Sequence, residues 1–242
     1  MSRALTAQSR VELALTLRNG EQLLLTLVIP VLVLVFFSLA DVLPLPEGTD
    51  EAVDFLAPGV LALAVLSTSF TGLAIATGFD RQYGVLKRLG ATPLGRPRLL
   101  AAKTVSVIAV MVLQFVVLVA VAVALGWRPD LVPHVVVGAV LLATVAFAGL
   151  ALLMAGTLSG LTTLAAANGV YIALLLLGDL VISHESLPAP VADAAGLLPV
   201  AALAQLVRAG ASGGHGEAGA WIVLAAWAVA APLAAARWFR WE

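Results

Sequence analysis

The side chains that could do covalent or metal chemistry are few in this chain, and they are scattered. It contains no cysteine, and its three histidines are His134, His184 and His215. His184 and Glu185 are adjacent, which is not a spacing at which one helix offers two ligands to a metal. A serine nucleophile such as the one in "GTLSG" needs a histidine partner at its own depth, and no histidine lies deep within a long apolar run. We therefore predict no catalytic residue and no metal site.

The sequence also lacks the motif of a phosphate-binding loop. A phosphate-binding loop ends in Gly-Lys-Ser or Gly-Lys-Thr, and the nearest approach is "LAAKT", in which Ala102 precedes Lys103. The formal net charge of -1 lacks the basic excess that general nucleic-acid binding requires. The sequence therefore supplies no phosphate-binding loop of its own.

One basic stretch is the most unusual feature that remains. The segment "FDRQYGVLKRLGATPLGRPRLLAAK", residues 79–103, holds six of the 13 Lys and Arg residues. Its pattern predicts a short helix that begins with Asp80 as N-cap and ends at Leu89 before a capping Gly90. The predicted helix gathers three apolar side chains on one side and projects three cations elsewhere: Tyr83, Leu86 and Leu89, then Arg81, Lys87 and Arg88. Such a helix suits either a membrane surface or a groove on another protein.

The rest of the chain is apolar enough to lie in a membrane. Hydrophobic residues make up 62% and charged residues 11% of the 242 residues, and the mean hydropathy is +1.07. A membrane-spanning helix needs about 20 apolar residues. Six stretches qualify: 23–43, 56–78, 104–126, 132–158, 161–183 and 220–237. We predict an all-α membrane domain over residues 23–242, preceded by an N-terminal segment over residues 1–22.

The distribution of Lys and Arg predicts the orientation of these spans. With the N-terminus inside, eleven of the 13 Lys and Arg residues lie on the inner side, and only Arg128 and Arg208 lie outside. Because translocation of basic residues is disfavoured, both termini should be cytoplasmic. The basic stretch then becomes a cytoplasmic loop, and part of its charge is a topology signal.

A few polar residues inside the predicted spans are candidates for packing or for function. The second span carries small residues in steps of three and four: Ala64, Ser67, Thr71, Ala74 and Gly78. We expect this stripe to pack closely against another helix. Gln114 in the third span is expected to pack helices, and Asn168 in the fifth either lines a path or makes an interhelical hydrogen bond.

The basic loop resembles the cytoplasmic loop of ABC-2 type exporter permeases, a group that includes drug, antibiotic and polysaccharide exporters. Asp80 and Arg81 match the first two positions of the acidic-Arg-acidic triplet that opens the coupling helix of that family, and Gln82 replaces the third. The stretch "SHESLPAPVADAAGLLPVAALAQLVRAG" is similar to the family's re-entrant hairpin, with Pro199 at its turn and Arg208 after its second arm. Residues 3–20 would correspond to the family's interfacial elbow helix.

The resemblance implies a half-transporter in the plasma membrane. Its partners would be a second permease subunit, identical or different, and a cytoplasmic ATPase that carries ATP and Mg, with no cofactor on this chain. Residues 80, 81, 83 and 86–89 would contact the ATPase, while Ser67, Thr71 and Asn168 would line the pathway or subunit interface. The exported substrate would be an amphipathic small molecule, a drug or a lipid-linked compound. Two alternatives are a membrane assembly or sensor subunit and an ion-coupled carrier.

Overall fold

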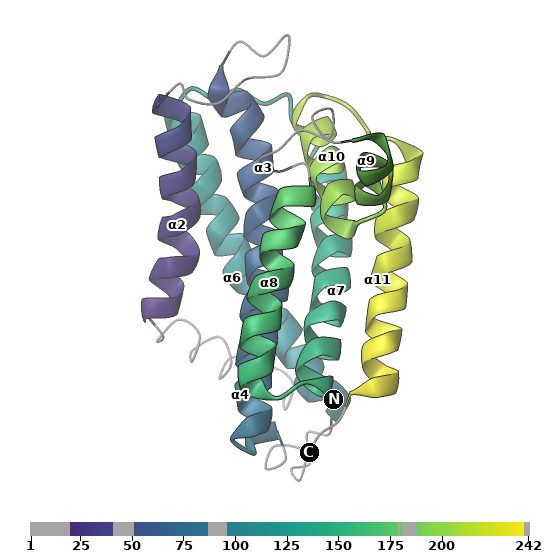
Figure 1. Cartoon of the computed structure of the whole chain (residues 1–242). Coiled ribbons are helices and arrows are strands. Elements are labelled where there is room, and N and C mark those ends of the chain that lie inside the picture. Colours follow the sequence, from purple (N-terminus) through teal and green to yellow (C-terminus); the bar gives the residue numbers. More distant parts are fainter. Residues whose placement is uncertain (1–19, 41–50, 87–95, 179, 181–187, 240–242) are drawn as a thin grey trace.

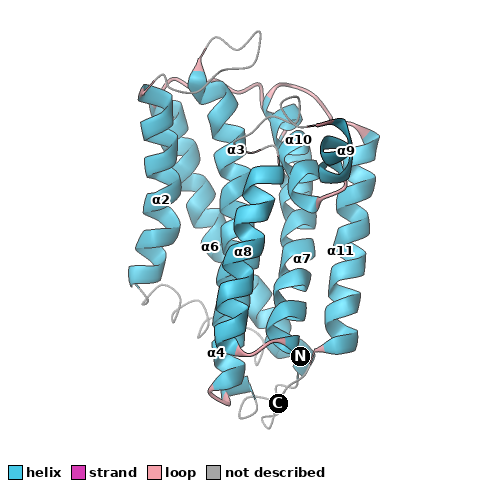
Figure 2. Ribbon diagram, in the orientation of Figure 1, coloured by secondary structure: helices cyan, strands magenta, loops and turns pink. Residues whose placement is uncertain are grey.

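The computed structural model of the chain describes residues 20–40, 51–86, 96–178, 180 and 188–239. This part of the chain is helical and contains no strand (Figure 2). The elements are α2 (Gly20–Leu39), α3 (Ala52–Leu66), the π-helix η1 (Ser67–Gly72), α4 (Leu73–Gln82), α6 (Arg96–Ala124), α7 (Pro133–Thr157), α8 (Gly160–Leu177), α9 (Ala189–Gly196), α10 (Pro199–Ala211) and α11 (Ala218–Trp238). The predicted elbow helix lies outside the described residues.

The described helices are long and apolar enough for a multi-pass membrane protein, as the composition predicts. Five of them meet the length and hydropathy of a membrane span: the continuous α3–η1–α4 rod of 31 residues, α6, α7, α8 and α11. The pair α9 and α10 is bent by 80° at its break, and α2 contributes the shorter apolar stretch Leu27–Leu39. Helix α8 ends at Leu177, before the predicted end at residue 183. Its C-cap is Gly178, where an added Cβ would lie 2.6 Å from Cγ1 of Val200 in α10.

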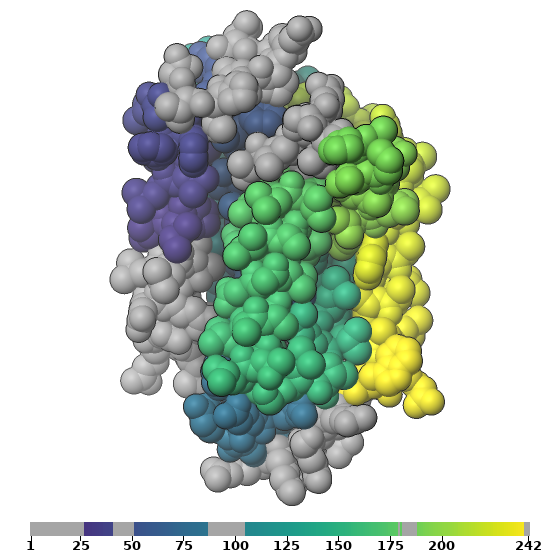
Figure 3. Space-filling model, viewed as in Figure 1, coloured from purple at the N-terminus to yellow at the C-terminus, as the bar shows by residue number. Residues whose placement is uncertain are grey.

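Two rods form the centre of the bundle. In the most apolar stretch of each, 72% of the α3–η1–α4 residues and 61% of the α7 residues are buried, against 22% in α8 and α11. Helices α2, α6, α8 and α11 surround these rods (Figure 1), and α2, α8 and α11 present broad outer faces (Figure 3). The outer helices therefore offer apolar surface to lipid.

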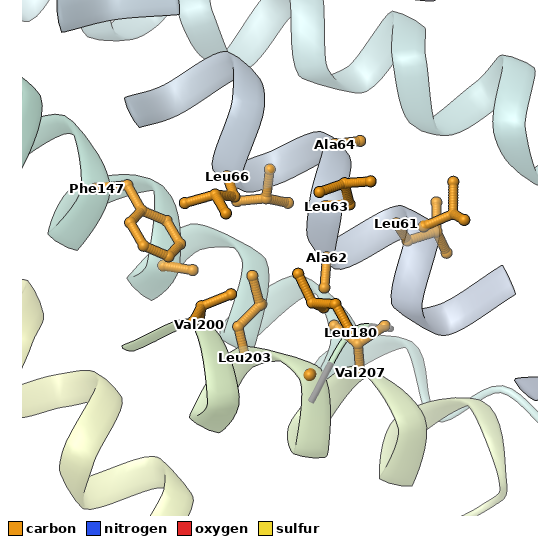
Figure 4. Close-up of a cluster of buried hydrophobic side chains, with 14 of the residues drawn as sticks. Leu61, Ala62, Leu63, Ala64, Leu66, Phe147, Leu180, Val200, Leu203 and Val207 are labelled. Carbon is orange, nitrogen blue, oxygen red and sulfur yellow. The ribbon is translucent and has the colours of Figure 1, made fainter. Parts of the chain in front are cut away.

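The bent pair places α10 inside the bundle. The break at Leu197 and Leu198 lies where the sequence predicts a turn, and Pro199 begins α10. The Leu197 carbonyl accepts a hydrogen bond of 2.9 Å from the Trp227 indole of α11. Side chains of α10 meet those of α3 and α7 in the core shown in Figure 4, including Leu203 and Phe147. Burial of α10 thus joins the two central rods at one end of the bundle.

A glycine of α7 allows a close contact between the backbones of α7 and α11. A Cβ added to Gly149 of α7 would lie 2.5 Å from the Pro232 nitrogen of α11, which means that the two backbones touch. The Gly-x-x-x-Gly sequence formed by Gly156 and Gly160 does not make one shared face. Gly156 instead lies against Phe239, which follows α11, and Gly160 lies against Gln82 of α4.

Candidate functional site

The second span continues through the residues expected to open the coupling helix. Helix α4 contains Asp80 and ends at Gln82, with Tyr83 as its C-cap. Gly84 follows at φ +70°, a left-handed conformation suited to glycine, and its N–H donates to the Arg81 carbonyl at 3.0 Å. The prediction that Asp80 caps a new helix was wrong, since α4 runs unbroken from Leu73 through Asp80 to Gln82. Helical backbone resumes only at residue 85.

Arg81 binds the end of another span. Its Nη1 donates to the carbonyl oxygens of Ala155 at 2.8 Å and Leu158 at 3.0 Å. These residues lie in the last turn and at the C-cap of α7. The last carbonyls of a helix have no donor within it, and the C-terminal end of a helix attracts a cation. This Arg81 clamp fastens the end of α4 to the end of α7.

The start of α8 packs against the same turns of α4. A Cβ on Gly78 would lie 3.1 Å from the Thr163 Cβ, and one on Gly160 would overlap the Gln82 side chain. Ser159 caps α8, because its Oγ accepts the Thr162 N–H at 3.3 Å. Because α7 ends at Thr157 and α8 begins at Gly160, the two helices form a tight hairpin. Its tip and the end of α4 form one packed unit.

The two described apolar residues of the predicted docking side have different surroundings. Tyr83 is 67% exposed, and its ring stacks on Phe79 at 5.9 Å between centroids. Leu86 is completely buried, so the expectation that the two gather on one side of a helix was wrong. The turn at Gly84 breaks the three-residue spacing on which that expectation depended. Lys87, Arg88 and Leu89 lie outside the described residues.

The predicted stripe of the second span crosses the π-helix η1. A π-helix closes its hydrogen bonds over five residues, so the steps of three and four that define one α-helical face do not continue through it. Ala64, Ala74 and Gly78 are buried, whereas Ser67 and Thr71, within η1, are only half-buried. A place for the two hydroxyl residues on the pathway or subunit interface stays a prediction.

A buried hydrogen bond joins η1 to the third span. The Thr68 hydroxyl donates to the Gln114 side-chain oxygen at 2.6 Å, and both residues are buried. The prediction that Gln114 packs helices is therefore confirmed. The signal was a single amide within an apolar run, but its partner could not be read from the sequence.

We expect this pair to couple energetically. In a double-mutant cycle of Thr68→Val and Gln114→Leu, the coupling energy should be about 0.6 kcal/mol and no more than about 1.7 kcal/mol, as for other hydrogen bonds between membrane helices. Reversible unfolding in mixed micelles would measure it. Strictly additive effects of the two substitutions would show that the bond contributes nothing to the packing of η1 against α6.

Asn168 faces outward from α8. Its side-chain nitrogen donates to the Leu164 carbonyl of the same helix at 2.8 Å, and the residue is exposed. The sequence left open an interhelical hydrogen bond for Asn168. The bond that its side chain forms instead lies within α8. Exposed apolar residues share its helix: Leu161, Ile172 and Leu176.

An apolar pocket that sequence reasoning missed lies between α2 and α3. Its cavity volume is about 40 Å³, and it is lined by Val33, Phe37, Phe55, Leu56, Gly59, Val60, Leu63 and Leu180. A Cβ on Gly59 would lie 3.2 Å from the Leu180 carbonyl oxygen, so glycine permits this approach. The Arg208 guanidinium carbon lies 4.9 Å from the centroid of Phe55, which brings a cation close to the pocket. The sequence signal for this pocket was the pair Pro58 and Gly59 within the second span.

Comparison with known proteins agrees with this arrangement. The family model described as ABC-2 type transporter matches residues 3–211, which include every described helix except α11. A search of curated proteins finds no match to the sequence. The family match covers well over half of the chain and joins the spans, the basic loop and the bent pair in one unit. The chain belongs to the ABC-2 type transporter family, as a membrane-spanning permease component and not as an ATPase.

Proposed function

We propose that this chain is the permease half of an ATP-driven exporter, docked by a separate ATPase at the end of α4. The observation that carries the proposal is the family match, which extends from residue 3 in the N-terminal segment to residue 211 at the end of α10. It favours a permease over the sensor subunit and the ion-coupled carrier. The orientation follows from the basic residues: both termini and the loop after α4 face the cytoplasm, and the bilayer is the plasma membrane.

The packing at the end of α4 supports a role in transmitting force. ATP and Mg bind to the partner ATPase, whose surface contacts exposed Tyr83 and the basic residues that follow in sequence. A load on this turn reaches Arg81, and from there the carbonyls of Ala155 and Leu158. The end of α4 and the tip of the α7–α8 hairpin therefore move together, because packed cores transmit displacement. Arg81 acts as a positioning residue rather than as a contact for the ATPase.

The outer faces and the apolar pocket support an amphipathic substrate. A second permease subunit covers the side that exposes α2 and α8, where Phe36 is 60% and Ile172 54% exposed (Figure 3). Ser67 and Thr71 line this side together with Asn168. The pocket between α2 and α3 accepts an apolar group, and Arg208 beside Phe55 favours an anionic or aromatic neighbour.

A change at Tyr83 should separate the ATPase from the permease. Tyr83→Asp places a carboxylate in an apolar contact, where its desolvation is unfavourable. We expect an ATPase chain to co-purify with the tagged wild-type protein and to be lost from this variant. The matched control is Leu131→Asp, which puts the same charge on another exposed apolar residue. Leu131 lies just before the start of α7, at the end of the bundle opposite to Tyr83.

Quantitative mass spectrometry of material purified from native membranes in mild detergent would measure the bound ATPase. Retention of the ATPase by both variants would place the docking site elsewhere. A folded wild-type protein with no ATPase bound would contradict the proposed function itself.

A further inference from the structure

Two of the three histidines of this chain meet in the folded structure. The ring centroids of His134 and His215 lie 5.5 Å apart, with the ring planes at 45°. His134 occupies the first turn of α7, and His215 belongs to the loop between α10 and α11. Both are exposed. The two residues are far apart in the sequence, so no motif shows the pair, and they lie at the end of the bundle opposite to the Arg81 clamp.

Backbone hydrogen bonds hold the two segments against each other. The Gly213 N–H donates to the Asp130 carbonyl at 2.7 Å, and the Val132 N–H donates to the Gly210 carbonyl at 2.7 Å. The His215 carbonyl accepts a bond of 3.0 Å from the Trp221 indole. Gly213 has φ +77°, a left-handed conformation that makes this tight connection possible. The two imidazoles are thus carried by a frame that is fixed on both sides.

The spacing of the rings fits coordination of one ion. A tetrahedral Zn²⁺ that binds two imidazoles at about 2.0 Å holds their ring centroids roughly 5 Å apart, close to the separation of His134 and His215. No group of three or more metal-ligating side chains occurs in the described part of the chain, so water would complete the shell. Imidazole suits borderline divalent ions such as Zn²⁺ rather than Mg²⁺ or Ca²⁺.

We propose that His134 and His215 form a two-histidine binding site for Zn²⁺ between the start of α7 and the loop that enters α11. A bound ion would fasten this loop to α7 and stabilise the packing of α11 on α7. The site does not depend on the proposed transport function, because it requires only the folded chain.

Calorimetric titration of Zn²⁺ into the full-length protein in detergent tests the site, provided that the purification tag contains no histidine. The chain has no cysteine to compete for the ion. We expect one Zn²⁺ per chain, and a loss of affinity of at least about tenfold in His134→Gln and in His215→Gln, since even indirect changes around a metal cost that much. The matched control is His184→Gln, which removes the third histidine and should leave the affinity unchanged.

Thermal unfolding of the same proteins separates binding from misfolding. Without Zn²⁺ all variants should unfold at the temperature of the wild type, and Zn²⁺ should raise that temperature only in the wild type and in His184→Gln. If a glutamine variant unfolds early, the asparagine variant at the same position replaces it. An absence of binding by the wild type, an unchanged affinity in both single variants, or an equal loss in His184→Gln would overturn the proposal.

Discussion

Replacing Gly149 with alanine should destabilise the bundle more than the same replacement at any other described glycine within a helix. The new Cβ would lie 2.5 Å from the Pro232 nitrogen and 2.6 Å from the Ala231 carbonyl carbon. Both are backbone atoms of α11, so no side chain can rotate out of the way. Overpacking a core typically lowers the free energy of unfolding by about 1–3 kcal/mol, and we expect a loss of about 2 kcal/mol or more here. Helix α11 would have to move away from α7 along their shared contact.

The matched control is the same substitution at Gly169 of α8, where an added Cβ has no atom within 4 Å. Alanine favours a helix over glycine by about 0.8–1.0 kcal/mol, so Gly169→Ala should be neutral or stabilising. The two identical changes therefore have opposite expected signs. Thermal unfolding followed by tryptophan fluorescence would measure both. Equal shifts in the unfolding temperature would contradict the close approach of α7 and α11.

Arg81→Ala should loosen the joint between α4 and the α7–α8 hairpin. The substitution removes the donor that two carbonyls share, and a hydrogen bond to a charged group contributes about 1.5–3 kcal/mol. We expect a lower unfolding temperature together with an ATPase that still binds, because exposed Tyr83 is unchanged. Arg81→Lys should recover only part of the loss, since a lysine lacks the planar fork of donors.

Arg237→Ala provides the control for Arg81→Ala. Arg237 is an exposed cation in the last turn of α11, at the same end of the bundle. Its removal changes the net charge by the same amount, so an effect of charge alone on topology or ATPase binding would appear in both variants. If Arg81→Ala behaves like Arg237→Ala, the clamp has no structural role.

Much of the fold follows from the amino-acid pattern. Long apolar runs specify the spans, because a backbone in lipid must satisfy its own hydrogen bonds. Proline and glycine mark the interruptions correctly at Pro199 and in the tight hairpin around Ser159. These features are local, and local chemistry decides them. The membership in the ABC-2 family also follows from residues that the loop and the bent pair display in the sequence.

The features that escaped prediction depend on contacts between distant segments. Nothing near Asp80 shows that Arg81 will find the carbonyls of α7, and this partner extends the second span beyond its apolar part. The π-helix shifts the register of Ser67 and Thr71, which an α-helical repeat cannot reveal. The pocket between α2 and α3 and the pair of histidines likewise arise only when separate elements pack together.

The central claim is that ATP hydrolysed on a separate chain acts on this permease through the end of α4. The direct measurement is the ATP turnover of the purified complex in lipid nanodiscs, compared with that of the ATPase alone and with the Arg81→Ala complex. The account predicts that the wild-type permease changes the turnover of the ATPase, and that Arg81→Ala binds the ATPase but leaves its turnover near the value of the ATPase alone. An ATPase whose turnover is the same with and without the wild-type permease would contradict the account.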